Sequence, residues 1–242
     1  MNKTRLDLAL IERGLVPSRE RARAVILAGQ VTVDGQVVSK AGAPVPPEAR
    51  VELATPDHPY VGRGGVKLAH ALDEFSIDAT GRRALDVGAS TGGFTDVLLQ
   101  RGAASVIALD VGRGQLDWRL RTDARVIVRE GVNARVLTAE DVPHKVTLVT
   151  IDVAFISLRH ILPALPPFLE GAADLVALVK PQFEAGRHEV GKRGLVTDPL
   201  VHEAVLARVT EAAVATGFTR VAMTPSPITG ATGNQEFFLH LR

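Results

Sequence analysis

The stretch that decides the fold of this chain is Arg83-Ala-Leu-Asp-Val-Gly-Ala-Ser-Thr-Gly-Gly-Phe-Thr-Asp-Val-Leu-Leu99. Its apolar beginning predicts a short buried strand, and Phe94, Val97 and Leu98 predict one face of a following helix. Glycines in the turn between them tolerate positive φ, and the helix N-terminus beside it offers free N–H groups. The stretch therefore predicts an α/β fold with a nucleotide-type site, whose loop consists of Gly88, Ala89, Ser90, Thr91 and Gly92.

The loop and the next strand indicate which nucleotide binds. No Gly-Lys-Ser/Thr ending is present, which argues against a triphosphate-binding loop. The strand expected at residues 105–110 ends in Asp110, where a carboxylate can accept hydrogen bonds from a ribose diol. Together with Asp86 in the first strand, this is also the pattern of S-adenosylmethionine sites. We expect a nucleoside-bearing cofactor; a purely structural glycine turn is the alternative.

Composition narrows the class of protein. The chain has 242 residues, 46% of them hydrophobic, which suffices for a large domain and a small one. It has no run of 18 apolar residues and no signal-peptide core, so we expect a cytoplasmic protein without membrane contact. The absence of cysteine excludes disulfides, thiolate catalysis and cysteine-based zinc sites. With a formal net charge of +1, nucleic-acid binding would have to come from local patches.

Residues 1–56 are expected to form a separate α+β module. A first helix ends before Gly14, and a second follows the N-cap Ser18. Asp34-Gly35 between two β-rich runs predicts a hairpin. The apolar positions expected on the second helix are Ala22, Val25, Ile26 and Leu27.

Prolines at positions 44–59 predict a stiff connection after this module, because proline cannot continue helices or inner strands. We place a linker at residues 57–61 and a second domain at residues 62–242.

Basic side chains gather in the small module. Arg19 and Arg23 are four positions apart on the second helix and share a face, which Arg5 can join. Such a patch suits RNA phosphates; solvated arginines around a small core are the alternative. The pattern Arg5-Leu-Asp7, Ser18-Arg19 and Val33-Asp-Gly35 resembles an RNA-binding module shared by a small-subunit ribosomal protein and several rRNA modifiers. The resemblance implies that Arg19 and Arg23 lie against RNA.

Strands and helices continue to alternate after Asp110, which predicts a doubly wound, Rossmann-like sheet. Strands are expected at residues 124–128, 146–152, 174–180, 220–223 and 236–241, and a helix at residues 201–216. In such sheets ligands bind beyond the carboxyl ends of the strands. Asn133, Asp152 and Lys180 all follow strands, so we expect them in one crevice with the glycine loop. A surface charge at a strand end is the alternative for each charged residue.

An amine beside carboxylates at this crevice suits methyl transfer to a ribose hydroxyl, which must lose its proton as it attacks. Lys180 can accept that proton only as the neutral amine, a form favoured by partial desolvation and by a second cation such as Lys67. Asp152 and Glu236 would oppose this charge effect but orient the amine. Lys67 lies in the first turn of an expected helix, where a cation is unfavourable. A solvated lysine is the alternative there.

Segments across the second domain resemble the TlyA family, rRNA cytidine 2′-O-methyltransferases with a methyltransferase domain of the FtsJ type. These segments are Leu85–Thr95, Ala108–Leu116, Asp152–Leu158, Val179–Glu184 and Gly233–Leu239. The resemblance implies S-adenosylmethionine as cofactor, ribosomal RNA as partner and no metal. It also implies a catalytic tetrad of Lys67, Asp152, Lys180 and Glu236, with Lys180 as the base. Phe155 would lie beside the cofactor and Asn133 near its adenine.

The sequence departs from the family pattern at several positions. The linker reads His58-Pro-Tyr60-Val61 without the family's arginine, and Ala154 replaces a serine. The chain ends at Arg242, whereas longer family members carry an extra C-terminal helix. The shorter family members modify large-subunit rRNA alone and the longer ones both subunits, so the resemblance implies large-subunit rRNA as substrate, with small-subunit rRNA as the alternative. Residues 181–199 contain few core residues, and we expect them to form a mobile lid whose cations contact RNA phosphate; a solvated loop is the alternative. Candidate RNA contacts in the second domain are Arg63, Lys192 and Arg193.

Rival functions remain open from sequence. A ribosome assembly factor that binds the cofactor without catalysis would share both domains. A small-molecule methyltransferase would not need the N-terminal module. A membrane-lytic protein would need an amphipathic or apolar insertion segment, which the sequence lacks.

Overall fold

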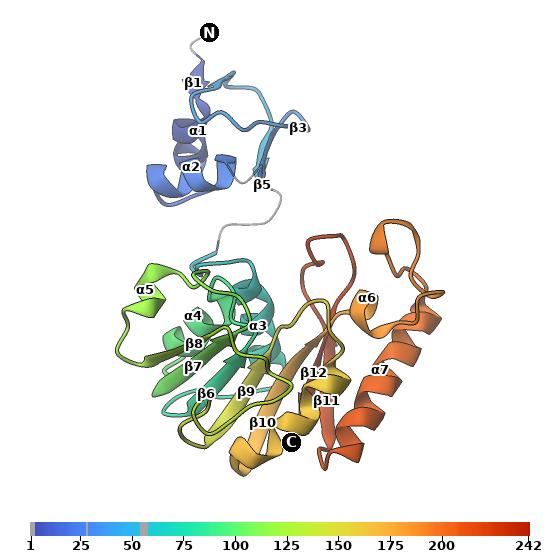
Figure 1. The fold of residues 1–242 in the computed structure, drawn as a ribbon. Helices are drawn as coiled ribbons and strands as arrows, with labels where there is room; N and C mark the ends of the chain where they lie inside the picture. Colours follow the sequence, from blue (N-terminus) through green and yellow to red (C-terminus); the bar gives the residue numbers. More distant parts are fainter. Residues whose placement is uncertain (1–2, 28, 54–57) are drawn as a thin grey trace. The chain divides into compact units, whose positions relative to one another are not determined.

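The computed structural model describes residues 3–27, 29–53 and 58–242, and it divides the chain into two compact units (Figure 1). The first unit is Met1–Pro59 and the second is Tyr60–Arg242. Most of the linker expected at residues 57–61 belongs to described residues, but residue 57 lies outside them.

The first unit packs two helices against short strands. Helices α1 (Leu6–Glu12) and α2 (Arg19–Leu27) accompany a sheet of order β3-β2-β5 (Gln36–Val37, Val31–Val33, Val51–Leu53) and a pair formed by β1 (Thr4–Arg5) and β4 (Pro44–Val45). Asp34 and Gly35 join β2 to β3 with positive φ values of 50° and 79°, as the sequence predicts. Ser18 Oγ accepts a hydrogen bond from Arg21 N at 3.2 Å, in keeping with its expected role as N-cap.

The four apolar positions of α2 differ in burial. Ala22, Val25 and Ile26 are buried, but Leu27 is 76% exposed. Successive helix positions differ by about 100° around the axis, so the residue after Ile26 turns away from the buried face.

The second unit is built on a seven-stranded sheet of order β11-β12-β10-β9-β6-β7-β8. The strands are β6 (Arg83–Val87), β7 (Ser105–Asp110), β8 (Val126–Glu130), β9 (Val146–Ile151), β10 (Leu169–Val179), β11 (Arg220–Pro225) and β12 (Phe237–Leu241). Strands β6 to β10 are parallel, while β12 is antiparallel to β10 and β11 is antiparallel to β12. The expected doubly wound sheet is confirmed, with an antiparallel edge.

Two strands begin elsewhere than expected. Strand β8 starts at Val126 instead of residue 124, because the Asp123 carboxylate accepts a hydrogen bond from Arg125 N at 2.9 Å and makes a turn there. Strand β10 starts at Leu169, five residues early, and its pairing with β9 has an irregularity between Leu169 and Asp174.

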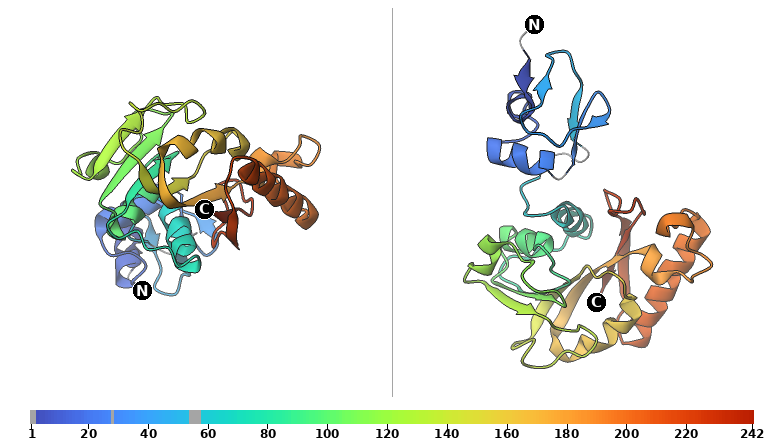
Figure 2. Two further views of the ribbon diagram at one scale, coloured as in Figure 1. Left: turned by 90° about the horizontal axis from the view of Figure 1, so that it is seen from below. Right: turned by 45° about the horizontal axis from the view of Figure 1, so that its top comes forward.

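Helices cover both faces of this sheet (Figure 2). Helices α3 (Gly64–Glu74) and α4 (Gly93–Gln100) share one apolar core with Phe238. Helix α7 (Pro199–Ala215) and the 3₁₀ turns η1 (Leu158–His160), η2 (Leu162–Ala164) and η3 (Pro166–Phe168) pack on the other. Short helices α5 (Trp118–Arg121) and α6 (Pro181–Glu184) follow β7 and β10. Within the described ranges, no helix is long and apolar enough to span a membrane.

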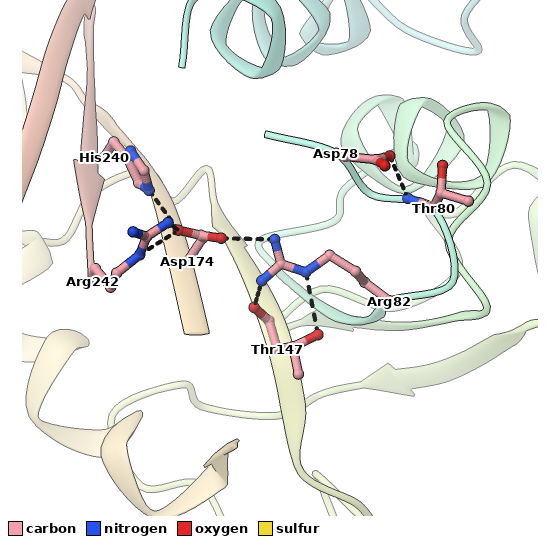
Figure 3. Close-up of polar contacts among 7 residues, drawn as sticks. All are labelled: Asp78, Thr80, Arg82, Thr147, Asp174, His240 and Arg242. Carbon is pink, nitrogen blue, oxygen red and sulfur yellow. Dashed lines mark hydrogen bonds and ion pairs between the residues drawn. The ribbon is translucent and has the colours of Figure 1, made fainter. Parts of the chain in front are cut away.

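An ion cluster closes the end of the sheet where the parallel strands begin (Figure 3). Asp174 of β10 contacts Arg82 Nη1, His240 Nε2 and Arg242 Nη2, each at 2.7 Å. Arg82 also donates hydrogen bonds to Oγ1 and the backbone oxygen of Thr147 at the start of β9. Burial alone would raise the pKa of Asp174, but the hydrogen bonds from His240, Arg82 and Arg242 bring this pKa below its usual value. The cluster thus joins β9, β10 and β12 to the residue that precedes β6.

Candidate active site

The loop between β6 and α4 requires glycine at two positions. Gly88 and Gly92 have φ values of 86° and 98°, which L side chains rarely adopt. A Cβ atom on Gly88 would lie 2.3 Å from the backbone oxygen of Asp152, and one on Gly92 would lie 2.2 Å from Leu120 Cδ1. The loop is therefore packed directly on the residue that ends β9.

Asp110 at the end of β7 holds this loop by its carboxylate. Its Oδ2 accepts a hydrogen bond from Ser90 N at 2.8 Å, and its Oδ1 accepts one from Gly112 N at 2.7 Å. A carboxylate oxygen can accept more than one hydrogen bond, so Asp110 retains capacity for a ribose diol.

A cavity of about 550 Å³ opens between the loop, the end of β7 and the residues after β9. Its lining combines apolar side chains with Asp110, Asn133 and Asp152, and it includes Gly88, Ser90 and Phe155. A neighbouring cavity of about 140 Å³ shares Gly88, Ser90 and Asp152 with it and adds Gly64, Ala89, Thr91, Gly93 and Phe94. Apolar walls with a few polar groups suit a small organic ligand. The glycine cradle and the carboxylate at its rim fit the nucleoside and amino-acid parts of S-adenosylmethionine.

The structure thus brings together most of the expected cofactor residues. Gly88, Ala89, Ser90, Thr91, Asp110, Asn133, Asp152 and Phe155 line one or both cavities. Gly92 is in neither lining; it is the N-cap of α4.

The four expected catalytic side chains form two ion pairs. Lys180 Nζ lies 2.5 Å from Asp152 Oδ1, at the ends of the adjacent parallel strands β10 and β9. Lys67 Nζ of α3 lies 2.5 Å from Glu236 Oε2, directly before β12. Glu236 therefore pairs with Lys67 and not, as expected from the sequence, with Lys180. The alternative of a solvated Lys67 is wrong, because that residue is 8% exposed.

Helix α3 begins beside Asp152. A Cβ on Gly64 would be 3.9 Å from Asp152 Oδ2 and 3.4 Å from the Phe94 ring. The start of the helix that carries Lys67 therefore borders the Lys180–Asp152 pair. Arg63, which precedes the helix, is half-buried and its Nη2 donates to Thr229 O at 3.4 Å.

Asp86 lies fully buried in β6, just before the glycine loop. Its carboxylate accepts hydrogen bonds from Thr95 Oγ1 of α4 at 2.7 Å and from Thr150 Oγ1 of β9 at 2.9 Å. Burial raises the pKa of Asp86 to about 7, and the two hydrogen bonds only partly oppose this. The residue ties the loop's helix to the strand that carries Asp152.

Phe155 is 91% exposed and has a φ of 62°, although it follows a buried strand. Its ring contacts that of Phe183 on α6, with 5.1 Å between the ring centroids. A bulky residue with positive φ is strained and must be held by its surroundings.

Comparison with known proteins agrees with this geometry. The model of FtsJ-like methyltransferases matches residues 60–242, and that of the S4 domain matches residues 4–51. A Mycobacterium tuberculosis protein named 16S/23S rRNA (cytidine-2′-O)-methyltransferase TlyA is 46% identical over 99% of this chain and 90% of its own length. The chain belongs to the TlyA family of FtsJ-like methyltransferases.

Two further relatives of this TlyA-family chain are informative. The Campylobacter jejuni 23S rRNA (cytidine-2′-O)-methyltransferase TlyA is 34% identical over 75% of this chain and 70% of its own length. A solved structure of a hemolysin-like protein from Streptococcus thermophilus is 43% identical, covers 100% of this chain and 88% of its own, and superposes with a TM-score of 0.78.

In the S4 domain, the three arginines that the sequence predicts as RNA contacts surround the buried carboxylate of Asp7. Arg5 binds it through Nε and Nη2, each at 3.0 Å. Arg19 Nε lies 3.0 Å from Asp7 Oδ2, and Arg23 Nε lies 3.8 Å from the same atom. The hydrogen bond from Arg5 is the largest cause that holds the pKa of Asp7 below its usual range. The arginine side chains are about half exposed, so one carboxylate orders three outward cations.

Residues 181–199 contact the rest of the methyltransferase domain through a few buried residues. Lys192 and Arg193 are exposed, and of the residues in this segment only Pro181, Glu184 and Val196 are buried, so the expectation of few core residues is confirmed. Asn234, 1% exposed, accepts a hydrogen bond from Val196 N at 2.8 Å and donates one to Gly194 O at 2.9 Å.

Sequence reasoning missed Asp7 as an organiser, and it missed Asn234 and Glu184. The carboxylate of Glu184 accepts hydrogen bonds from Ser157 and Leu158, and burial raises its pKa. A glutamate in a short helix after Lys180 carries no signal of burial.

In the part of the chain that the structure describes, no three His, Cys, Asp or Glu side chains are grouped to hold a metal ion.

Proposed function

We propose that this chain methylates the 2′-hydroxyl of a cytidine in ribosomal RNA, with S-adenosylmethionine as the methyl donor and Lys180 as the general base. The observation that carries the proposal is the Lys180–Asp152 pair, 2.5 Å apart, beside a glycine-cradled cavity. Family membership supports the reaction type, since the two curated relatives described above are named as cytidine-2′-O-methyltransferases.

The cofactor would be held by residues of both cavities. Gly88, Ala89, Ser90, Thr91 and Gly92 form the loop on which it rests, Asp110 would accept the ribose hydroxyls, and Asn133 would lie near the adenine. Phe155 would cover its side. When bound, S-adenosylmethionine supplies an electrophilic methyl group on a sulfonium centre.

Residues of this chain would remove the proton of the 2′-hydroxyl and stabilise the charge that results. Lys180 Nζ would take the proton of the 2′-hydroxyl, and the Asp152 carboxylate that contacts Nζ would stabilise the resulting ammonium. Lys67 and Glu236 form a buried ion pair in which their charges cancel. They would therefore contribute by holding the structure of the site in place. Proton removal by a fixed amine meets the need of a weakly acidic hydroxyl without a metal ion.

RNA would be bound by cations of both domains. In the S4 domain, Arg5, Arg19 and Arg23 would contact phosphates, because Asp7 orders them while leaving them half exposed. In the methyltransferase domain, Arg63, Lys192 and Arg193 would add contacts. We assign the RNA-binding module to residues 1–56, the linker to 57–61 and the methyltransferase domain to 62–242.

We further propose large-subunit rRNA as the substrate. The M. tuberculosis relative is named for 16S and 23S rRNA and the C. jejuni relative for 23S rRNA alone, so 23S rRNA is common to both. A ribosomal substrate would place the protein in the cytoplasm.

The test is to incubate the purified chain with S-adenosylmethionine carrying a labelled methyl group and with unmodified ribosomal subunits, and to map the label by mass spectrometry. We expect label on a cytidine ribose of 23S rRNA, and none with Lys180→Ala. Lys145→Ala, which removes an exposed lysine before β9, is the matched control and keeps activity. Cofactor binding without label on any rRNA would instead indicate a non-catalytic assembly factor.

A further inference from the structure

Glu184 is a buried carboxylate to which the mechanism above gives no part. It is 5% exposed and ends α6, four positions after Lys180. Its Oε2 accepts a hydrogen bond from the Ser157 hydroxyl at 2.5 Å, and its Oε1 accepts one from Leu158 N at 2.7 Å. Both donors belong to the segment that leaves β9 after Asp152, so the contacts join two regions 26 and 27 positions apart in the sequence.

These contacts are the last of three connections between the chain segments that follow β9 and β10. The first connection is the Lys180–Asp152 ion pair at the ends of these neighbouring strands. The chain then departs from both strand ends, and Glu184 joins the two paths again. Between the ion pair and Glu184, the rings of Phe155 and Phe183 are in contact. The two paths are therefore tied at their start, middle and end.

The segment held by Glu184 is one that needs support. Phe155 has a φ of 62°, a conformation that costs a bulky residue energy and persists only when neighbours impose it. Ser157 caps η1 by accepting a hydrogen bond from Arg159 N at 3.2 Å, while its own hydroxyl donates to Glu184. The burial of Glu184 makes these hydrogen bonds hard to replace by water.

We propose that Glu184 is a positioning residue for methyl transfer: by holding Ser157 and Leu158, it fixes Asp152 and Lys180 at their working separation. Glu184 is absent from both cofactor cavities, so its action passes through the backbone. The assignment rests on the proposed function, and it extends that function to a residue outside the tetrad. Reacting groups held on rigid elements keep their rate only while a supporting set of contacts fixes them.

The test measures kcat and both KM values for methyl transfer to ribosomal subunits. In Glu184→Ala we expect kcat to fall at least about tenfold with each KM changed less than about threefold, because a displacement near 1 Å can cost about a hundredfold. Glu184→Gln should restore most of kcat, since its amide oxygen can accept from Leu158 N and its NH₂ can donate to Ser157 Oγ. Ser157→Ala, which removes a single hydroxyl, should show the same loss in smaller degree.

Glu189→Ala is the matched control. Glu189 lies in the same segment, and its carboxylate accepts from Gly186 N at 2.6 Å and from Arg208 Nη2 at 2.9 Å. We expect it to keep kcat. Should Glu184→Ala fail to fold, Ser157→Ala and Glu184→Gln carry the test together: Ser157→Ala should lose kcat, while Glu184→Gln should keep most of it.

The outcomes separate this assignment from the proposed function. A folded Glu184→Ala with the kcat of the unaltered chain would overturn it, as would an equal loss in Glu189→Ala. An unaltered chain that labels no rRNA contradicts the proposed function first, and this assignment with it.

Discussion

Lys67 and Glu236, 169 positions apart in the sequence, form a buried ion pair in which Nζ lies 2.5 Å from Oε2. The pair joins the first turn of α3 to the residue before β12, and both side chains are almost fully enclosed. A Cβ on Gly230 would lie 2.3 Å from Glu236 Oε1, so the loop before β12 is also packed against this carboxylate.

Removing both partners of this pair should cost less stability than the sum of the two single losses. Lys67→Met and Glu236→Gln should each lower the free energy of unfolding by about 3 kcal/mol, because each leaves a buried polar partner without its counterpart. The double variant should lose clearly less than the sum of the two. Urea unfolding measures this. The exposed pair Arg83–Glu170 is the control, for which the single changes should cost less than about 1 kcal/mol. Additive losses at Lys67 and Glu236 would refute the coupling.

Asp110→Asn should weaken cofactor binding. The amide keeps one acceptor oxygen, so either Ser90 N or Gly112 N loses its partner and the ribose diol loses a charged acceptor. We expect the Kd for S-adenosylmethionine, measured by calorimetry, to rise about tenfold or more. Asp117→Asn, at the N-cap of α5 and outside both cavity linings, should leave the Kd unchanged. Equal affinity in both variants would argue against Asp110 as a ribose ligand.

Asp86 should make stability depend on pH near neutrality. Its pKa is raised from 3.8 to about 7 by burial, so ionisation of Asp86 opposes folding. The stability that its neutral form contributes is complete below about pH 4 and is lost as the pH rises through about 7, a change on the order of 2–4 kcal/mol.

Asp86→Asn should therefore show a flatter profile of melting temperature between pH 5 and pH 8.5 than the unaltered chain. An amide can still form hydrogen bonds with Thr95 and Thr150, so the folded state is kept. Asp141→Asn, in the loop before β9, is the control and should follow the unaltered profile. Parallel profiles for Asp86→Asn and the unaltered chain would contradict the raised pKa.

Asp174→Asn should destabilise the methyltransferase domain at neutral pH without affecting the cofactor. Arg82 and His240 would lose the buried carboxylate that they share, which should cost about 3 kcal/mol in urea unfolding. Since the pKa of Asp174 lies below its usual value, its stabilisation is present above about pH 4 and is lost as the pH falls through the folded pKa. The difference between Asp174→Asn and the unaltered chain should therefore shrink in acid.

Asp78→Asn is the control for this cluster. Asp78 lies in the same region (Figure 3), where its carboxylate accepts a hydrogen bond from Thr80 N at 2.8 Å, and it contacts none of the three cations. An unchanged stability of Asp174→Asn at neutral pH would refute the role of the cluster.

The double variant Lys192→Ala with Arg193→Ala should weaken rRNA binding and lower its salt dependence. Each lost phosphate contact should reduce the slope of log K against log salt by roughly 0.7–0.9. The matched control is Lys145→Ala with Arg220→Ala, which removes the same charge from exposed positions at the opposite end of the sheet. Equal salt slopes for the two double variants would refute an RNA contact by residues 192 and 193.

The sequence was informative wherever position along a parallel strand decides location. Asp110 ends β7, and Asp152 and Lys180 directly follow β9 and β10, so topology alone brings these residues to one edge of the sheet. The pairing within the tetrad could not be predicted from the sequence. Which carboxylate contacts Lys67 depends on where the antiparallel strand β12 lies in the sheet.

Buried polar residues were the hardest to anticipate. Asp7 and Glu184 are charged side chains that sequence rules assign to the surface. Each accepts hydrogen bonds from donors that the folded chain brings together: Arg5 and Arg19, 2 and 12 positions from Asp7, and Ser157 and Leu158, 27 and 26 positions from Glu184. Such convergence has no periodic signal, so only coordinates reveal it.

The contact between Gly88 and the backbone of Asp152 limits how this site can evolve. Any side chain at position 88 would push against the carbonyl of the residue that holds the proposed base, so a mutation there would disturb cofactor binding and proton transfer together. Variation that tunes the cofactor alone must therefore arise at neighbours such as Ala89 or Thr91. The residues that bind the cofactor and those that hold the proposed base are therefore under a shared constraint at this position.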